Sequence, residues 1–194
     1  MTSLTECNLP SEGCLLLDFP KIDIERVVDI AADHIVRDNS NHVNIKKRAQ
    51  DSGYDAVHIG RETLADPKRT KYLYSESEWT EYREPFIGSY VHEVCLQLED
   101  YIKQRYNLNI GRIRFNLLPA KSCLTLHQDK QETHRFHIPI MTNDSCFFVN
   151  NMRVYQMLTE GALYAYSVRE QHTAVNASRE PRVHLVLSTY ETDH

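Results

Sequence analysis

The sequence predicts a mainly β protein, with a double-stranded β-helix core of the jelly-roll or cupin-like kind and supporting helices in its N-terminal part. Two observations lead to this prediction. Helical spacing of apolar residues is confined to the first 111 residues, whereas from residue 112 onward short runs rich in β-branched and aromatic residues alternate with turn residues. About eight short strands within some 80 residues are typical of a sandwich or jelly roll, and helices placed earlier in the chain can cover one sheet from outside.

The N-terminal part contains one short predicted strand and two predicted helices. Cys14–Phe19 is apolar and ends before Pro20, as a short strand would. Apolar residues at helical spacing then predict one helix from about 22 to 37 and a second helix over 86–106. The second helix is followed by a predicted stop at Asn107–Gly111, because asparagine and glycine favour the ends of helices.

Residues 38–85, between the two predicted helices, are the least regular part of the chain. They are rich in charge and in turn formers, with strand-like pieces at Ala56–Ile59 and Tyr72–Tyr74. A polar stretch of this length inside a domain is often a functional loop, so we interpret it as a candidate lid. Loop packing and solvated charge are the commoner roles of its side chains, but some can bind substrate: Tyr72, Tyr74, Trp79, Tyr82, Lys46, Lys47 and Arg48.

The C-terminal part consists of predicted strands separated by turn residues. The eight strand-like runs are Arg112–Leu118, Cys123–His127, Phe136–Met141, Cys146–Asn150, Val154–Leu158, Ala162–Val168, His172–Val175 and Arg182–Thr189. We therefore expect one domain over residues 1–194. In that domain, 1–111 would supply helical support and substrate loops, and 112–190 would form the jelly-roll core.

Composition narrows the class of protein. The chain has 194 residues, of which 41% are apolar and 25% charged, as in an ordinary globular domain. Its net charge of −5 gives no general attraction to nucleic acid or to anionic membranes. Five cysteines, an odd number without a CxxC pair, argue against a disulfide framework and a structural zinc site. Because no long apolar run occurs, we expect no membrane attachment and a cytoplasmic location.

Two histidines and one aspartate form a candidate catalytic metal site. His127 and Asp129 are two residues apart, so in a strand they point to the same face, and His172 begins a later predicted strand. Two imidazoles and one carboxylate are the ligands of the facial triad of Fe(II) oxygenases, which leaves positions open for a co-substrate and O₂. The same donors can hold zinc for hydrolysis, but no HExxH motif is present, so iron is preferred.

Arg182, ten residues after His172, is the candidate anchor of a co-substrate. Strand alternation places Arg182 and His184 on one face, so both are candidate cofactor-binding residues. A guanidinium that points into a barrel needs an anionic partner, and 2-oxoglutarate would supply one carboxylate to Arg182 and its keto acid end to the metal. Arg135 and His137 are same-face neighbours in another run and can reach the metal-bound end of the co-substrate or a substrate carboxylate.

Several motifs in order resemble the aspartyl/asparaginyl β-hydroxylase family of Fe(II)- and 2-oxoglutarate-dependent dioxygenases, a group that includes proline 3-hydroxylase-like enzymes. The resemblance covers roughly residues 112–190. Its carriers are Leu126-His127-Gln128-Asp129, Arg135-Phe136-His137-Ile138-Pro139, Gly161-Ala162-Leu163-Tyr164, and His172-Thr173-Ala174-Val175-Asn176 followed by Arg182.

The resemblance implies a role for each matching residue. The iron ligands would be His127, Asp129 and His172, and the contacts to 2-oxoglutarate would include Arg182, Arg135, His137 and Asn116. Gly161 and Asn176 would be structural, one in a tight turn and the other bonding local backbone. Some members that act on protein side chains lack the acidic ligand, and the presence of Asp129 is similar to members with a complete triad.

The expected activity is hydroxylation of an unactivated C–H bond of an amino acid, or of an amino-acid side chain in a peptide or protein, with release of succinate and CO₂. Three alternatives stay open at this point. One is a zinc- or other metal-dependent cupin-like isomerase or hydrolase, and another is a non-catalytic jelly-roll binding module with structural histidines. The third is a dioxygenase of nucleic-acid bases, against which the net acidity argues.

Overall fold

The computed structural model describes residues 9–38, 42–48, 77, 79–129 and 134–190. Its largest element is a six-stranded sheet in which every neighbouring pair is antiparallel. In spatial order the strands are β1 (Cys14–Leu16), β10 (Tyr164–Ser167), β7 (His134–Met141), β12 (Arg182–Tyr190), β5 (Asn109–Leu118) and β2 (His42–Asn44). The long strands β7, β12 and β5 lie side by side at its centre, and β12 is buried along almost its whole length.

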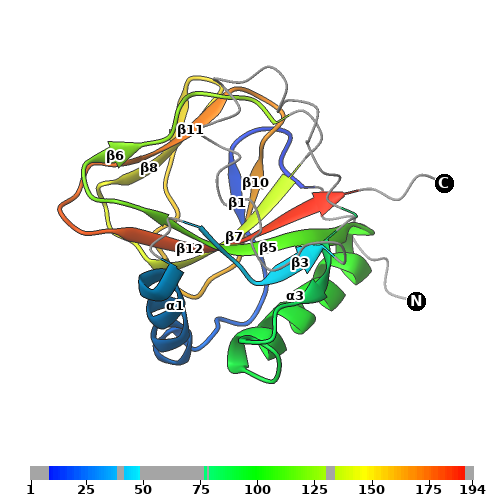
Figure 1. Cartoon of the computed structure of the whole chain (residues 1–194). Coiled ribbons are helices and arrows are strands. Elements are labelled where there is room, and N and C mark those ends of the chain that lie inside the picture. The colour runs from blue at the N-terminus through cyan, green and yellow to red at the C-terminus, as the bar shows by residue number, and fades with distance from the viewer. Residues whose placement is uncertain (1–8, 39–41, 49–76, 78, 130–133, 191–194) are drawn as a thin grey trace, which may run out of the picture.

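A four-stranded antiparallel sheet faces one side of the larger sheet. Its strands are, in order, β6 (Ser122–Cys123), β11 (His172–Asn176), β8 (Cys146–Asn150) and β9 (Arg153–Tyr155). A further pair is formed by β3 (Lys46–Arg48) and β4 (Trp79–Tyr82). Among the described residues, helices α1 (Ile24–Asp38) and α3 (Tyr90–Tyr106) lie on the opposite side of the larger sheet from β6, β8 and β11 (Figure 1).

Buried apolar residues fill both spaces between these layers. The larger cluster joins α1 and α3 to the six-stranded sheet and includes Val27, Leu98 and Phe136. A smaller cluster, with Phe148 and Tyr166, lies toward the four-stranded sheet. Because this second cluster is small, the space between the two sheets keeps room for polar side chains. No described helix is both long enough and apolar enough to cross a membrane.

The second helix begins later than its periodicity predicts. Residues 84–88 form a turn, and Gly88 has a φ of +76°, which an L side chain rarely adopts. Ser89 then caps α3 by accepting a hydrogen bond from the His92 N–H. The helix ends at Asn107, which is left-handed and donates its N–H to the Lys103 carbonyl. The predicted stop was therefore right at Asn107, but β5 already starts two residues later.

The predicted strands of the C-terminal part coincide with β5 to β12, and the jelly-roll prediction is confirmed. Differences lie at the edges. Strand β9 is shorter than the predicted run Val154–Leu158, and β6 ends at Cys123, four residues before the predicted end at His127, which forms an isolated bridge. The strands β2, β3 and β4 were missed inside residues 38–85. They are three or four residues long and mostly polar, so they show no usable alternation. The predicted pieces Ala56–Ile59 and Tyr72–Tyr74 lie outside the described residues.

The N-terminal part also contributes to the larger sheet. Both of its edge strands come from residues before 112: β1 lies within the predicted short strand Cys14–Phe19, whereas β2 lies in the stretch 38–85 that was interpreted as a loop. Lys46, which was considered as a substrate-binding residue, is buried and ion-paired with Glu99 on α3. The lid role of residues 38–85 stays a prediction.

Candidate active site

His127 and His172 are brought together by direct pairing of their backbones. The His127 N–H donates to the His172 carbonyl (N–O 3.0 Å), and the His172 N–H donates to the His127 carbonyl (2.7 Å). The two residues form an isolated antiparallel bridge between the segment after β6 and the start of β11. Residues opposite each other in such a bridge project to the same face, and the two imidazole centroids are 4.4 Å apart.

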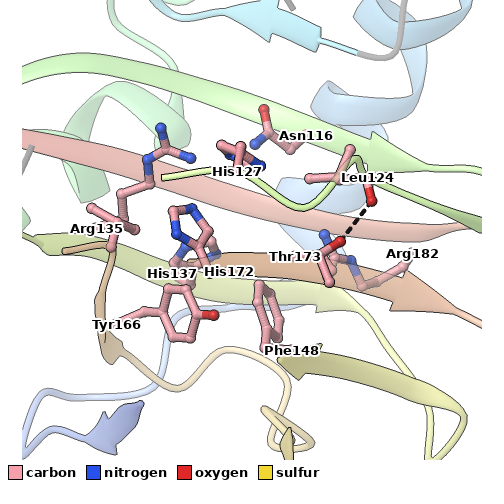
Figure 2. A pocket seen from close by; sticks show the side chains of 12 residues that line it. Asn116, Leu124, His127, Arg135, His137, Phe148, Tyr166, His172, Thr173 and Arg182 are labelled. Carbon is pink, nitrogen blue, oxygen red and sulfur yellow. Dashed lines mark hydrogen bonds between the residues drawn. The ribbon is translucent and has the colours of Figure 1, made fainter. Parts of the chain in front are cut away.

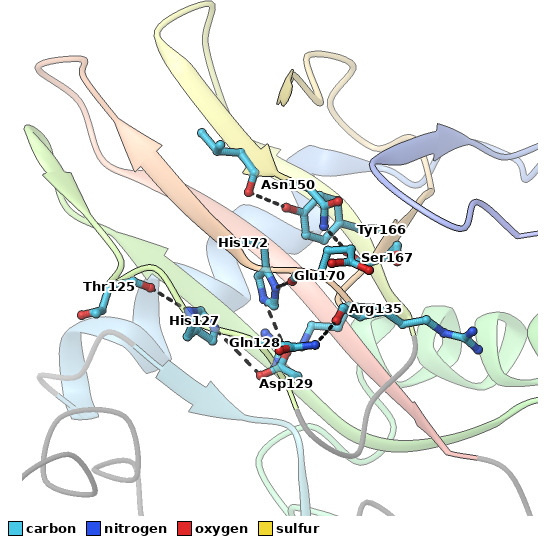
Figure 3. A network of polar contacts seen from close by, with 12 residues as sticks. Thr125, His127, Gln128, Asp129, Arg135, Asn150, Tyr166, Ser167, Glu170 and His172 are labelled. Carbon is cyan, nitrogen blue, oxygen red and sulfur yellow. Dashed lines mark hydrogen bonds and ion pairs between the residues drawn. The ribbon is translucent and has the colours of Figure 1, made fainter. Parts of the chain in front are cut away.

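Asp129 completes the predicted triad. Its Oδ1 lies 3.8 Å from His127 Nε2, and its Oδ2 lies 3.5 Å from His172 Nε2 (Figure 3). One ligand atom from each of the three residues lies within 4.8 Å of the others. Asp129 and His172 are 43 residues apart in the sequence, and the fold brings them together in one cluster of potential ligands.

Backbone carbonyls orient both imidazoles of the candidate metal site. His127 Nδ1 lies 2.7 Å from the Thr125 carbonyl, and His172 Nδ1 lies 2.9 Å from the Glu170 carbonyl. A carbonyl only accepts, so Nδ1 carries the proton in each ring and the lone pair resides on Nε2. The Nε2 atom of His172 is buried without a hydrogen-bond partner among the described residues. Two free imidazole lone pairs and a carboxylate fit an Fe(II) or Zn(II) ion.

A pocket between the two sheets leads from these ligands to Arg182. Figure 2 shows the side chains that line it, which are Asn116, Leu124, His127, Arg135, His137, Phe148, Tyr166, Val168, His172, Thr173, Ala174 and Arg182. Four of them come from the sheet of β11 and β8, and others project from β5, β7 and β12 on the opposite sheet. The pocket therefore unites six of the eight predicted site residues and lies beside Asp129.

Arg182 is a buried cation without an anionic partner in the described structure. It is 3% exposed, and its Nε and Nη1 atoms have no hydrogen-bond partner. Its guanidinium lies over the Phe148 ring, 4.7 Å from the centroid. Burial lowers the pKa of Arg182 to about 10, so the group is still charged at neutral pH. A buried, incompletely bonded cation at the end of a pocket provides a site for an anion.

His137 and His184 are uncharged neighbours of Arg182. Burial lowers the pKa of each imidazole well below its ordinary value, and the charge of Arg182 lowers both further. His137 lines the pocket, but His184 does not: it is fully buried and packs against the rings of His137 and Phe148. Strand alternation thus places Arg182 and His184 on the same face of β12, but it does not show that only Arg182 lines the pocket.

The other predicted contacts lie where alternation places them. Arg135 and His137 both line the pocket, while Phe136 between them belongs to the core on the other face of the sheet. Asn116 on β5 lies opposite His184 on β12 and also lines the pocket. Arg135 makes an additional contact that the sequence did not predict, because its Nη2 lies 2.7 Å from Asp129 Oδ2.

With the fold and this geometry established, comparison with known proteins defines the family. A family model for aspartyl/asparaginyl beta-hydroxylases matches residues 34–192. The chain belongs to the aspartyl/asparaginyl β-hydroxylase family. The match confirms the family predicted from the C-terminal motifs and extends it back to residue 34, into a region where no motif was apparent. The prediction of an enzyme, a hydroxylase of the 2-oxoglutarate-dependent class, is confirmed at the level of the family.

Solved structures show the same fold at low sequence identity. A prolyl-4-hydroxylase from Pseudomonas putida has 13% identity and a TM-score of 0.51, and the match covers 94% of this chain and 95% of that chain. A viral collagen prolyl hydroxylase from Paramecium Bursaria Chlorella virus-1, solved as a 2OG complex, has 6% identity and a TM-score of 0.52, covering 93% and 97%. An oxidoreductase of the 2OG-Fe(II) oxygenase family from Burkholderia pseudomallei has 16% identity and a TM-score of 0.51, covering 92% and 84%. No curated protein matches the chain.

Several residues that support the site of this β-hydroxylase family member were not predicted. Thr173 Oγ1 donates to the Leu124 carbonyl (2.7 Å), which clamps the segment carrying His127 onto β11 (Figure 2). The Gln128 side-chain amide donates to the Arg169 carbonyl (Figure 3). Phe148 and Tyr166 form the apolar wall of the pocket. Their strand alternation could have placed these aromatic residues on the inner face, but only the three-dimensional pairing shows that they line the same pocket as His127 and His172.

Asn176 makes the contacts expected of a structural residue in the hydroxylase. Its side-chain amide donates to the carbonyls of Leu118, Pro119 and Glu180, and its Oδ1 accepts from the N–H of Ser178. These bonds fix the turn that leads into Arg182. Gly161, also predicted to be structural, has a φ of +75°, and a Cβ there would lie 2.8 Å from the Ile22 carbonyl oxygen.

The buried His184 gives the hydroxylase a predictable dependence of stability on pH. Burial lowers the pKa of His184, and the charge of Arg182 lowers it further. At mildly acidic pH the unfolded chain therefore binds a proton at His184 that the folded chain does not bind. The stability conferred by neutral His184 is therefore present above the unfolded pKa of about 6.5 and is lost as the pH falls below it, at about 1.4 kcal/mol per pH unit.

His184→Leu is expected to remove this contribution and to flatten the fall in unfolding free energy between about pH 7 and pH 5, as measured by urea denaturation. Val186→Ala, two positions along β12, removes apolar contacts but no titratable group. It should lower stability at every pH without changing the slope. An equal slope in wild type and His184→Leu would contradict the expectation.

Proposed function

We propose that the chain is an Fe(II)- and 2-oxoglutarate-dependent dioxygenase that hydroxylates an unactivated C–H bond of an amino acid, or of an amino-acid side chain in a peptide or protein, releasing succinate and CO₂. The observation that carries the proposal is the pairing of two features in one pocket. A cluster of His127, Asp129 and His172 with two oriented Nε2 atoms lies at one side, and the buried cation Arg182 lies at the other.

The three candidate metal ligands and Arg182 would bind different groups, the metal ion and the co-substrate. His127, Asp129 and His172 would hold Fe(II), and Arg182 would bind the carboxylate of 2-oxoglutarate distant from the metal. When bound together, iron and 2-oxoglutarate supply the activation of O₂ that an unreactive C–H bond requires. Neutral His137 and Asn116 line the same pocket and can donate hydrogen bonds to the co-substrate without adding charge.

The pocket also separates an enclosed end from an open end. Arg182 and His172 are 3% and 4% exposed, whereas Leu124 at the rim is 39% exposed. The enclosed end would keep the co-substrate away from water, and the open end beside His127 is the side from which an amino-acid side chain would approach. The rings of Phe148 and Tyr166 form the apolar side of the enclosed end. Burial raises the pKa of Tyr166 far above its ordinary value, so its hydroxyl is not ionised near neutral pH.

The same features disfavour the hydrolytic alternative. Hydrolysis at zinc needs a general base near the metal-bound water. The residues that line the described pocket include no carboxylate, and burial holds the pKa of His137 too low for an effective base near neutral pH. An unpartnered buried arginine has no role in water activation, but it fits a dicarboxylate co-substrate.

Anaerobic titration tests the proposal. Protein mixed with Fe(II) and 2-oxoglutarate should develop a weak visible charge-transfer band, and the band should be absent in His127→Ala. Admitting O₂ in the presence of a panel of amino acids and short peptides should then release succinate above the background rate for at least one of them. Zinc binding without the band, together with no succinate from any member of the panel, would contradict the proposed function.

A further inference from the structure

Arg135 connects the two sheets through a metal ligand. Its guanidinium Nη2 lies 2.7 Å from Asp129 Oδ2, and the two side chains are 13% and 17% exposed. An ion pair at this distance and burial is stronger than one on the surface. Arg135 belongs to β7 of the larger sheet, whereas Asp129 follows the segment that pairs with β11 of the smaller sheet (Figure 3).

The two ends of this contact belong to different kinds of backbone. Arg135 is flanked by Phe136, which is fully buried, and lies opposite Tyr166 on β10 and Ser188 on β12. On the other side, the backbone bridge ends at His127, and the Gln128 side chain makes the last hydrogen bond to the neighbouring loop before Asp129. A side chain fixed within a sheet thus contacts a carboxylate that follows the end of a short paired segment.

The contact also differentiates the two carboxylate oxygens. Oδ2 is the oxygen that contacts Arg135 and lies 3.5 Å from His172 Nε2, whereas Oδ1 is turned toward His127 Nε2 at 3.8 Å. Turning the plane of the carboxylate away from this orientation would lengthen the contact with Arg135. Arg135 therefore favours one plane of the Asp129 carboxylate in the absence of metal.

We infer that Arg135 is a positioning residue that orients Asp129 for metal binding. The inference rests on the proposed function, since it assigns Asp129 to the metal. Two effects oppose each other: the guanidinium repels a divalent cation, and it preorganises the carboxylate that binds that cation. Loss of partners that orient metal ligands typically weakens metal affinity by 10- to 100-fold, so preorganisation outweighs repulsion. This role differs from the co-substrate contact predicted from the sequence.

Metal titrations of Arg135 variants separate the two roles. Arg135→Met is expected to weaken the binding of Co(II), followed by its visible absorption, by roughly 10- to 100-fold, and Arg135→Lys should recover part of the loss. Affinity for 2-oxoglutarate, measured at saturating Co(II), should change much less. Arg153→Met is the matched control, because Arg153 forms an exposed ion pair with Glu12 away from the pocket. Circular dichroism of each variant checks the fold, and Arg135→Gln replaces Arg135→Met if the latter does not fold.

Asp129→Asn tests whether Arg135 acts through the carboxylate. In an Asp129→Asn background, Arg135→Met should cause little additional loss of Co(II) affinity, whereas independent roles would give additive losses. Unchanged Co(II) affinity in Arg135→Met with weakened 2-oxoglutarate binding would overturn the inference and leave the proposed function intact. Failure of the wild-type protein to bind Co(II) or Fe(II) would instead overturn the proposed function, and the inference with it.

Discussion

Replacement of Arg182 by methionine is expected to weaken 2-oxoglutarate binding by roughly two to three orders of magnitude. Truncating one partner of a buried, hydrogen-bonded charge pair costs about 2–5 kcal/mol, and in the proposed complex the other partner is a carboxylate. Metal affinity should change little, because the guanidinium lies over Phe148 at the end of the pocket and is not a metal ligand. Binding is measured by titrating 2-oxoglutarate into anaerobic protein saturated with Fe(II).

The same substitution should increase the stability of the protein without ligands. In the described structure the Nε and Nη1 atoms of Arg182 are buried without hydrogen bonds, so an apolar side chain of similar length removes an uncompensated cost. The expected gain in unfolding free energy is about 1–4 kcal/mol, measured by chemical denaturation. Arg153→Met at an exposed site should change neither quantity appreciably. Unaltered 2-oxoglutarate affinity in Arg182→Met would show that Arg182 is not the anion site.

Replacement of His172 by alanine is expected to reduce Fe(II) affinity by more than about 100-fold. His172 Nε2 is one of two imidazole donors in the cluster, and even partners outside the direct ligands contribute 10- to 100-fold. Hydroxylation and succinate release should fall to background. Bound iron is measured anaerobically by competition with a chromophoric chelator, which reports affinity independently of turnover.

A histidine on the opposite side of the larger sheet provides the control for His172→Ala. His92 lies on α3 and contacts the Tyr82 ring, so His92→Ala should retain Fe(II) binding. Backbone pairing of residue 172 with residue 127 does not depend on the side chain, so His172→Ala should keep its fold. Iron affinity in His172→Ala equal to that of the wild type would exclude His172 as a ligand.

Much of the architecture follows from local patterns in the sequence. The strands from β5 to β12 alternate or carry continuous apolar runs, and the helices show 3.6-residue periodicity, so their order and type could be predicted. The edge strands β2 and β3 could not, because strands of three polar residues are specified by their neighbours and not by their own pattern. Gly88 and the capping residue Ser89 mark the start of α3. The apolar residues at helical spacing begin before them, so the predicted helix started too early.

Sequence patterns also predict only part of the candidate site. Strand alternation correctly grouped Arg135 with His137 and separated both from Phe136. Alternation gives the face of a residue but not its distance from a cavity, and for that reason it could not show that His184 is absent from the pocket lining. The ion pair between Arg135 and Asp129 joins β7 to a segment that lies outside the strands, so strand alternation could not predict it.

The direct bridge between His127 and His172 couples the proposed metal site to the integrity of one sheet margin. Because β6 is only two residues long, opening this margin would separate the two imidazoles, and a metal ion bound between them as we propose would resist that opening. By the same linkage, removing the proposed metal would leave this margin easier to open.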